Sequence, residues 1–384
     1  MSPPTPIEIR DHLAGQDRRM QATLTRLVEF ETPSDEPSTM QPALEFLATE
    51  LEERGYRPRR RRGELVYASR RARTRHRPAQ LVVGHVDTVW PVGTLASRPV
   101  SLDGTVLRGP GAYDMKAGLV QILFAVGAIH ALGADPATEP VLLINGDEEI
   151  GSHRSRDVIE RLSRVACRAF VLEPGLGPLG LLKTARKGIG RFTVVVHGLA
   201  AHAGLDPDRG ASAILELSNV IQRLFALNDA SRGITVNVGT IEGGIRPNVV
   251  APTSKAVVDV RVLHHEDAAH ITEAIRSLEP STPGTTLSVE GGFGRPPMER
   301  TPGNVALLRV AEKIGAELGI EIGEATAGGG SDGNTTSQHI PTLDGLGAIG
   351  DGAHAASERV DVASLVDRTA LLASLLLHPE GDPP

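Results

Sequence analysis

The spacing of apolar residues changes along the chain, from a helical period at the start to short continuous runs further on. Leu44, Leu47 and Leu51 recur at helical spacing. Later apolar runs, such as 81–83 and 141–144, are short and uninterrupted, which is typical of strands buried on both faces. Helical stretches separate these runs. The alternation predicts an α/β domain whose sheet contains parallel strands.

A second pattern begins near Gly188, where strand-like and helical stretches follow one another in the order βαββαβ. The strand-like stretches are 191–198, 234–244, 254–263 and 285–292, and the helical ones are 209–226 and 266–277. This order is that of a split, ferredoxin-like unit. Because α/β texture returns after it, we expect residues 188–293 to form a domain inserted into an α/β domain made of residues 1–187 and 294–384.

Length and composition exclude several classes of protein. The 384 residues include one cysteine, Cys167, so no internal disulfide can form and any metal site must use histidine and carboxylate ligands. Aromatic residues make up 3% of the chain and the net charge is -7, which argues against a nucleic-acid partner. No secretory leader is recognisable and no run of about 18 apolar residues occurs. We therefore expect a cytoplasmic enzyme with no membrane partner.

Positive charge is concentrated in residues 54–77, which contain eleven arginines and one acid. The favoured interpretation is a solvated edge strand and loop with an Arg-rich composition. The alternative is a dedicated anion or nucleic-acid site. Only Tyr56 and Tyr67 interleave with the arginines, which weakens that alternative.

Acidic and imidazole side chains follow three of the predicted strands. These are His85 and Asp87, then Asp147, Glu148 and Glu149, and then Glu173. The carboxyl ends of parallel strands meet at one edge of a sheet, where ligands bind in open α/β domains. Asp114, in a Gly-rich loop, and His354, after a later apolar stretch, complete a cluster without cysteine.

Such a cluster of carboxylates would be costly without a positive charge to neutralise it, and one or two divalent cations would supply that charge. Histidine and carboxylate ligands suit zinc, with cobalt or manganese as alternatives. We predict that Asp114 bridges two ions. His85 and Glu173 would hold one ion, and Glu149 and His354 the other.

Two acids remain for other roles. Asp87 stands two residues after His85 and would accept the other imidazole N–H, which fixes the tautomer. Glu148 is left free to act as the general base for the attacking water. Taken alone, Glu148 and Glu149 could also be the solvated start of a helix; their occurrence with the rest of the cluster favours the catalytic interpretation.

The chain resembles the zinc aminoacylase and peptidase family that includes glutamate carboxypeptidase, succinyl-diaminopimelate desuccinylase and acetylornithine deacetylase. The matching motifs are GHVDTV (84–89), RGPGAYDMKAG (108–118), GDEEIGS (146–152), LEP (172–174), HGLAAHAG (197–204), GGGSDGN (328–334) and HAASE (354–358). The resemblance is nearest to the glutamate carboxypeptidase branch. It implies a mixed sheet with helices on both faces, a lid and dimerisation domain at 188–293, and a cis peptide after Asp114.

The resemblance also implies residues that spacing alone does not reveal. His202 resembles the lid histidine that reaches into the partner subunit's site and stabilises an oxyanion. Asn248 and Arg261 resemble lid residues that hold the substrate's free carboxylate, and the loop with Gly329 and Gly330 would bring backbone N–H groups to the substrate. Two alternatives stay open: His202 could mark an ordinary turn, and Arg261 could form a surface ion pair.

The predicted function is a dimeric di-zinc hydrolase that cleaves the amide bond of small N-acyl amino acids or dipeptide-like substrates with a free carboxylate. One alternative is a deacylase or desuccinylase of an amino-acid or natural-product intermediate, which would use the same residues. A second is a non-hydrolytic binding protein with the same fold. An intact Glu148 argues against the second, because binding alone would not require it.

Overall fold

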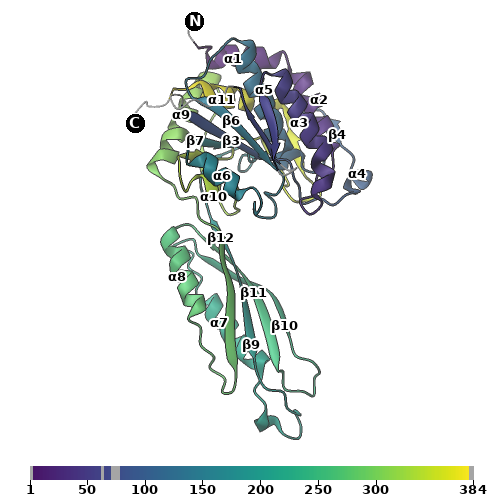
Figure 1. Ribbon diagram of the computed structural model, residues 1–384, viewed down its shortest axis with the longest axis vertical. Coiled ribbons are helices and arrows are strands. Elements are labelled where there is room, and N and C mark those ends of the chain that lie inside the picture. The colour runs from purple at the N-terminus through teal and green to yellow at the C-terminus, as the bar shows by residue number, and fades with distance from the viewer. Residues whose placement is uncertain (1–2, 62–64, 71–77, 380–384) are drawn as a thin grey trace. The chain divides into compact units, whose positions relative to one another are not determined.

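The chain folds into two compact units, which we describe separately (Figure 1). The structure is a computed structural model that describes residues 3–61, 65–70 and 78–379. The first unit comprises Met1–Thr184, Arg300–Ala327 and Ser331–Pro384, and the second comprises Ala185–Glu299 and Gly328–Gly330. The second unit therefore begins three residues before the predicted insertion and ends six residues after it.

A mixed six-stranded sheet forms the centre of the first unit, with strand order β1-β2-β6-β3-β7-β14. Its parallel strands are β3 (Ala79–His85), β6 (Glu139–Asn145), β7 (Ala166–Val171) and β14 (Thr342–Leu343). The antiparallel edge is formed by β1 (Arg57–Arg61) and β2 (Leu65–Ser69). These two strands belong to the Arg-rich segment, and β1 is an edge strand of the sheet, whereas residues 62–64 and 71–77 lie outside the described residues.

Helices cover both faces of this sheet, as the sequence predicts. On one face Val82 and Leu142 pack in a core with α5 (Ala117–Ala131). On the other face Leu81 and Val83 pack against α6 (Arg156–Ser163). The remaining helices of the unit are α1 (Pro6–Ala14), α2 (Asp17–Val28), α3 (Gln41–Glu53), α4 (Thr94–Ser97), α9 (Pro302–Leu318), α10 (Gly333–Thr336) and α11 (Leu365–Leu377).

One helical stretch within the described residues, Ala112–Ala131, is apolar and long enough to cross a membrane by length and composition alone. Of its most apolar window, 89% is buried inside the protein. The stretch includes α5, whose side chains pack in the same core as α1, α2 and α11. It therefore serves as a core helix of the first unit.

Two smaller sheets contain strands of the first unit and were not predicted. One has the order β15-β16-β5-β4 and consists of β15 (Gly350–Asp351), β16 (Arg359–Asp361), β5 (Val106–Arg108) and β4 (Ser101–Asp103). The other pairs β8 (Leu182–Arg186) with β13 (Glu324–Ala327). The strands of the first of these two sheets have only two or three residues each. Such strands are too short to show a period of two in the sequence.

The second unit has the predicted βαββαβ order. Its antiparallel sheet runs β10-β11-β9-β12, with β9 (Gly188–His197), β10 (Thr235–Gly243), β11 (Thr253–Val262) and β12 (Thr286–Arg295). Buried and less buried residues alternate along β11, so one face of the sheet packs on the helices α7 (Ala213–Phe225) and α8 (His265–Arg276). Figure 1 shows both helices on that one side.

Candidate metal centre

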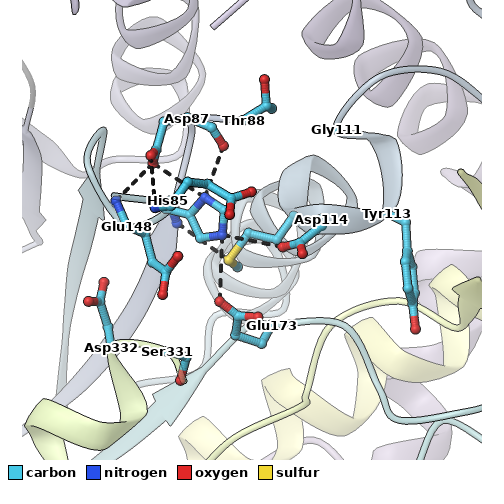
Figure 2. Close-up of polar contacts among 12 residues, drawn as sticks. His85, Asp87, Thr88, Gly111, Tyr113, Asp114, Glu148, Glu173, Ser331 and Asp332 are labelled. Carbon is cyan, nitrogen blue, oxygen red and sulfur yellow. Dashed lines mark hydrogen bonds and ion pairs between the residues drawn. The ribbon is translucent and has the colours of Figure 1, made fainter. Parts of the chain in front are cut away.

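The predicted acids and histidines of the first unit meet at one edge of its sheet. Figure 2 shows His85 there with Asp87, Asp114, Glu148 and Glu173. Strands β3 and β6 are parallel and in register, so that His85 lies opposite Asn145. The acidic segment 147–149 follows Asn145 directly. Glu173 comes two residues after the end of β7, which pairs with β3 on its other side. Parallel pairing therefore brings these chain segments together, as predicted.

Asp114 lies between the two histidines. Its Oδ1 is 3.4 Å from Nε2 of His85, and its Oδ2 is 3.4 Å from Nε2 of His354. Nε2 of His85 also lies 3.5 Å from Oε1 of Glu173, and Nε2 of His354 lies 3.0 Å from Oε2 of Glu149. Each histidine thus faces Asp114 and one further acid, which is the pairing that the sequence predicts for two ions.

Two groups among the described residues could each hold a metal ion. They are His85 with Glu148 and Glu173, and His85 with Asp114 and Glu149; within each group the ligand atoms lie within 4.8 Å of one another. These groups divide the acids differently from the predicted ligand sets, because Glu148 takes the place of Asp114 beside Glu173. All five residues nevertheless surround the same small volume, and His354 joins it through Asp114 and Glu149.

The side chains present fit divalent cations. Nε2 of His85 is buried and has no hydrogen-bond partner among the described residues, although it faces the carboxylates of Asp114 and Glu173. A buried imidazole nitrogen aimed at two carboxylates is well placed as a metal ligand. Nitrogen and oxygen donors without sulfur suit zinc, cobalt or manganese.

The cluster requires positive charge. Burial alone would lower the pKa of His85, but the adjacent carboxylates of Asp114, Asp87 and Glu173 raise it well above its usual value. Hydrogen bonds with Asp114 and Glu149 raise the pKa of His354 to about 10. Burial raises the pKa of Glu149, whereas the two histidines hold the pKa of Asp114 below its usual value despite burial. Bound cations would supply the charge that the carboxylates otherwise draw from protons.

Asp87 contacts more than the imidazole. Nδ1 of His85 lies 3.0 Å from the backbone oxygen of Asp87 and 3.4 Å from its Oδ1. The carboxylate accepts hydrogen bonds from the backbone N–H groups of Glu148 (3.2 Å) and Glu149 (3.1 Å), and from Oγ of Ser34 (2.7 Å). Asp87 therefore fixes the peptide that carries the predicted base as well as the ring of His85.

Two buried acids support the site and were not assigned a role from the sequence. Asp332 accepts hydrogen bonds from Nδ2 of Asn145 (2.7 Å) and from Oγ of Ser152, at the two ends of the loop that carries Glu148. Glu358 accepts four N–H groups around Asp114. Both lie inside motifs that carry the family resemblance, and that is the signal by which they could have been found.

His202 and Asn248 lie together in the second unit. Val249 forms a β-bridge with His202, and the backbone N–H of Ala203 donates to the backbone oxygen of Asn248. Both side chains are exposed. Nδ1 of His202 accepts the N–H of Gly204 at 3.2 Å, which leaves Nε2 pointing away from this turn. The structure brings these two predicted lid residues to one surface.

Arg261 lies elsewhere in the second unit. Its guanidinium forms an ion pair with Asp259 on the same strand, at 2.7 Å and 3.1 Å. The ion pair that the sequence left open is therefore present. The predicted glycines are tied to a different arginine, because Nη1 of Arg186 donates to the backbone oxygens of Gly329 and Gly330 at 3.2 Å each. The cis peptide suggested by the resemblance is present between Asp114 and Met115.

Comparison with known proteins identifies the family. The model of Peptidase family M20/M25/M40 matches residues 81–378, which include the whole cluster. The chain belongs to this family. It is accordingly a hydrolase of a metallopeptidase family, with the fold class predicted from its sequence.

The relatives of this chain within the M20 family include proteins named as a carboxypeptidase and as a deacetylase. Carboxypeptidase G2 of Pseudomonas sp. (strain RS-16) is 29% identical over 366 residues, which cover 92% of this chain and 88% of that protein. Acetylornithine deacetylase of Myxococcus xanthus is 30% identical over 286 residues, or 67% of this chain and 71% of that protein. The M20 family resemblance inferred from the motifs is thus confirmed.

Solved structures share the M20 fold. The aminopeptidase PepT from Bacillus cereus superposes with a TM-score of 0.80 at 21% identity, over 94% of this chain and 98% of that one. The YXEP protein of Bacillus subtilis, described as a dinuclear metal binding peptidase, gives a TM-score of 0.71 at 15% identity, over 95% and 98% of the two chains.

Proposed function

We propose that the protein is a dinuclear metal-dependent hydrolase that cleaves the amide bond of small N-acyl amino acids or dipeptide-like substrates with a free carboxylate. The observation that carries this proposal is the position of Asp114, with one oxygen 3.4 Å from each of two histidines. The names of two relatives, a carboxypeptidase and a deacetylase, support the substrate class.

Asp114 would bridge two divalent ions, most reasonably zinc. His85 and Glu173 would complete one coordination sphere, and Glu149 and His354 the other. Bound cations would supply Lewis acidity toward the scissile carbonyl and the attacking water. The rest of the chemistry falls to the side chains of the protein.

Glu148 is the side chain that we propose for proton transfer. It is buried, and its backbone N–H is held by Asp87, so the carboxyl group is presented from a fixed peptide. One of its oxygens lies within 4.8 Å of ligand atoms of His85 and Glu173. We propose that Glu148 takes a proton from the attacking water and returns it to the leaving amine.

The lid residues that we propose for substrate binding lie at opposite ends of one sheet. Arg261 pairs with Ile189, where the chain enters the second unit, whereas Thr253 pairs with His197 at the other end, next to His202 and Asn248. The eight intervening residue steps of β11 span about 26 Å at the usual rise of a strand. A small substrate cannot touch both ends.

A second subunit resolves this separation. We propose that Arg261 serves the site of its own chain, while His202 and Asn248 serve the site of the partner. The second unit exposes large apolar side chains that a second copy would cover. They are Leu199, Leu205, Ile214, Leu215, Ile241 and Ile245, between 48% and 76% exposed, in β10, the loop after it, the start of α7 and the loops beside His202.

Arg261 would hold the free carboxylate of the substrate. Its pairing with Asp259 keeps the guanidinium fixed on the strand, with Nη1 directed to the backbone oxygen of Gly328. A planar guanidinium held on one side can still present N–H groups to a second carboxylate.

The test is hydrolysis of a small panel with and without chelator and added zinc. The panel contains an N-acyl-glutamate, N-acetyl-ornithine, an N-succinyl amino acid and several dipeptides. Chelator-sensitive cleavage of the glutamate conjugate would support a carboxypeptidase G2-like activity. Chelator-sensitive cleavage of an acetyl or succinyl substrate instead would favour the deacylase alternative, which the acetylornithine deacetylase relative supports. Cleavage that chelator leaves unchanged would contradict the metal mechanism.

A further inference from the structure

Glu358 is a buried acid whose carboxylate is surrounded by N–H donors. Its side chain belongs to a residue only 3% exposed. Oε1 accepts the backbone N–H groups of Tyr113 (3.0 Å) and Asp114 (3.1 Å). Oε2 accepts the backbone N–H of Gly111 (2.9 Å) and Nε1–H of Trp90 (2.8 Å). Each carboxylate oxygen of Glu358 therefore accepts two hydrogen bonds.

Three of these donors belong to the segment 111–114, which ends at the bridging acid. Gly111 has a φ of 70°, and a Cβ added there would lie 2.3 Å from Cγ2 of Thr88, so the segment has little room to shift on that side. Hydrogen bonds from Glu358 hold its other side. With its backbone held in this way, Asp114 can direct one oxygen to His85 and the other to His354.

Glu358 also belongs to the loop that carries the second histidine. It follows His354 by four residues, and the backbone N–H of Glu358 donates to the oxygen of Ala355 at 3.0 Å. The turn continues through the N–H of Ala355, which donates to the oxygen of Gly352 at 2.9 Å. One carboxylate thus ties the segment of the bridging acid to the loop of a histidine that the acid faces.

We propose that Glu358 is a positioning residue for the metal centre, which sets the orientation of Asp114 relative to both histidines and couples that orientation to Trp90. The inference rests on the proposed metal site. It assigns no contact with metal or substrate to Glu358, because all four of its observed hydrogen bonds are made to protein N–H groups.

The chemistry of the four contacts requires a carboxylate. An amide of the same shape has one oxygen and one NH2 group. In Glu358→Gln the NH2 group would therefore face two N–H donors in either orientation of the amide. A buried donor left without an acceptor is costly, and the segment would shift to avoid it. Asp114 would then no longer direct its two oxygens to His85 and His354 as it does now.

The first measurement is zinc binding by Glu358→Gln, by competition with a chromophoric chelator. We expect both ions to bind about 10-fold to 100-fold more weakly than in the unaltered protein, because the affected ligand is shared. Glu31→Gln is the matched control, since Glu31 also accepts two backbone N–H groups, from Gly93 and Leu95, at 2.9 Å each. That control should bind zinc within about 2-fold of the unaltered protein.

Two results would overturn the proposal. If Glu358→Gln binds two zinc ions as tightly as the unaltered protein, the positioning role fails while the metal site stands. If the unaltered protein binds no zinc, cobalt or manganese, the metal site itself fails and the positioning role with it. Circular dichroism and thermal unfolding of each variant separate a loss of binding from a loss of fold.

Trp90 supplies a second readout that does not depend on the folding of Glu358→Gln. It is the only tryptophan of the chain, so tryptophan emission reports on the surroundings of its ring, which include the contact with Glu358 and the guanidinium of Arg98. Zinc added to the unaltered protein should change that emission, and Asp114→Asn should remove the change. Emission that stays constant while zinc saturates the unaltered protein would contradict the coupling through Glu358.

Discussion

At the scale of single residues, Asp87 illustrates how the site is held together. Its carboxylate accepts the N–H groups of Glu148 and Glu149, so one side chain fixes both the proposed base and a proposed metal ligand. Burial alone would raise the pKa of Asp87, but His85 and Ser34 hold it below its usual value. The charge therefore persists at neutral pH and continues to orient the groups around it.

The role of Glu148 gives the prediction that belongs to this scale. Glu148→Ala should retain two zinc ions and lower kcat by about 10³-fold, because a positioned general base contributes on the order of 10² to 10⁴. Metal content is measured by mass spectrometry and kcat on whichever substrate of the panel is cleaved. Glu160→Ala is the control and should keep normal turnover, because Glu160 is a partly exposed residue of α6 that pairs with Arg164. Near-normal kcat in Glu148→Ala would remove Glu148 from the mechanism.

The residue scale also shows what sequence reasoning could and could not find. His85 and Glu173 follow predicted strands, so their position was foreseeable. The contacts of Glu358 were not, because its partners Trp90 and Asp114 lie 268 and 244 residues away along the chain. The motif HAASE (354–358) includes Glu358, but it does not reveal which residues Glu358 contacts.

At the scale of elements, the close approach of α5 to the end of β7 positions two proposed metal ligands, Asp114 and Glu173. Gly118 lies in the first turn of α5, and a Cβ added there would come within 2.2 Å of the backbone oxygen of Leu172. Leu172 directly precedes Glu173, and Asp114 lies just before the helix. The absence of a side chain at Gly118 thus lets the helix and the strand end approach each other.

Gly118→Ala should lower the free energy of unfolding by about 1–3 kcal/mol, because a backbone atom must move to make room. Zinc binding should weaken as well, since Leu172 and Glu173 are adjacent. Gly127→Ala in the same helix is the matched control: its Cβ would meet only the flexible side chain of Arg54, at 3.2 Å. Urea unfolding of both variants checks this, and equal stability of the two would contradict the close-packing argument.

A second prediction at this scale concerns the inserted domain and pH. Burial alone would raise the pKa of Glu216 in α7, but hydrogen bonds from Thr282 and Ser281 lower it to about 2 from the usual 4.5. A group whose pKa is lowered on folding stabilises the protein above its unfolded pKa. That stabilisation is lost as the pH falls from about 4.5 toward 2.

Glu216→Gln should therefore lower the free energy of unfolding by about 1–3 kcal/mol at pH 7, since the hydrogen bonds to a charged acceptor are weakened. The difference from the unaltered protein should shrink below pH 4.5. Denaturant unfolding from pH 7 down to pH 3 measures it. A difference that stays constant over this range would show that Glu216 stabilises the fold through shape alone.

At the scale of the whole molecule, the separation between the two ends of the sheet in the second unit underlies our proposal that two chains build one site. If His202 acts in the site of the partner, two variants that are inactive alone should restore each other. His202→Ala and Glu148→Ala, mixed and allowed to exchange subunits, would give mixed dimers with one complete site. Half of the dimers would be mixed, so activity should recover to about 25% of the unaltered protein.

The oligomeric state is the control for that experiment. Leu205→Asp and Ile241→Asp place charges on the exposed apolar surface of the inserted domain and should shift the protein to monomers in sedimentation experiments. Such monomers should also lose activity, because they lack the partner's His202. No recovery from a stable dimer that exchanges subunits would place His202 in the site of its own chain or outside any site.

The sequence by itself determined the class of the longer helices and strands and the residues of the candidate metal cluster. Buried parallel strands show as apolar runs, and their ends meet at one edge whatever the details of packing, so the acids that follow them had to come together. The βαββαβ order of the inserted domain was equally visible. These features depend on local periodicity and on general rules of topology, and both can be read from one chain.

Only the tertiary structure decided how the cluster is oriented. That Asp114 turns one oxygen to each histidine, that Asp87 holds the Glu148 peptide, and that Glu358 accepts four N–H groups all depend on contacts between distant segments. The direction of a carboxylate is set by a few hydrogen bonds of about 3 Å, each with a partner that no local pattern specifies. Sequence reasoning therefore reached the residues of the site, and packing decided their geometry.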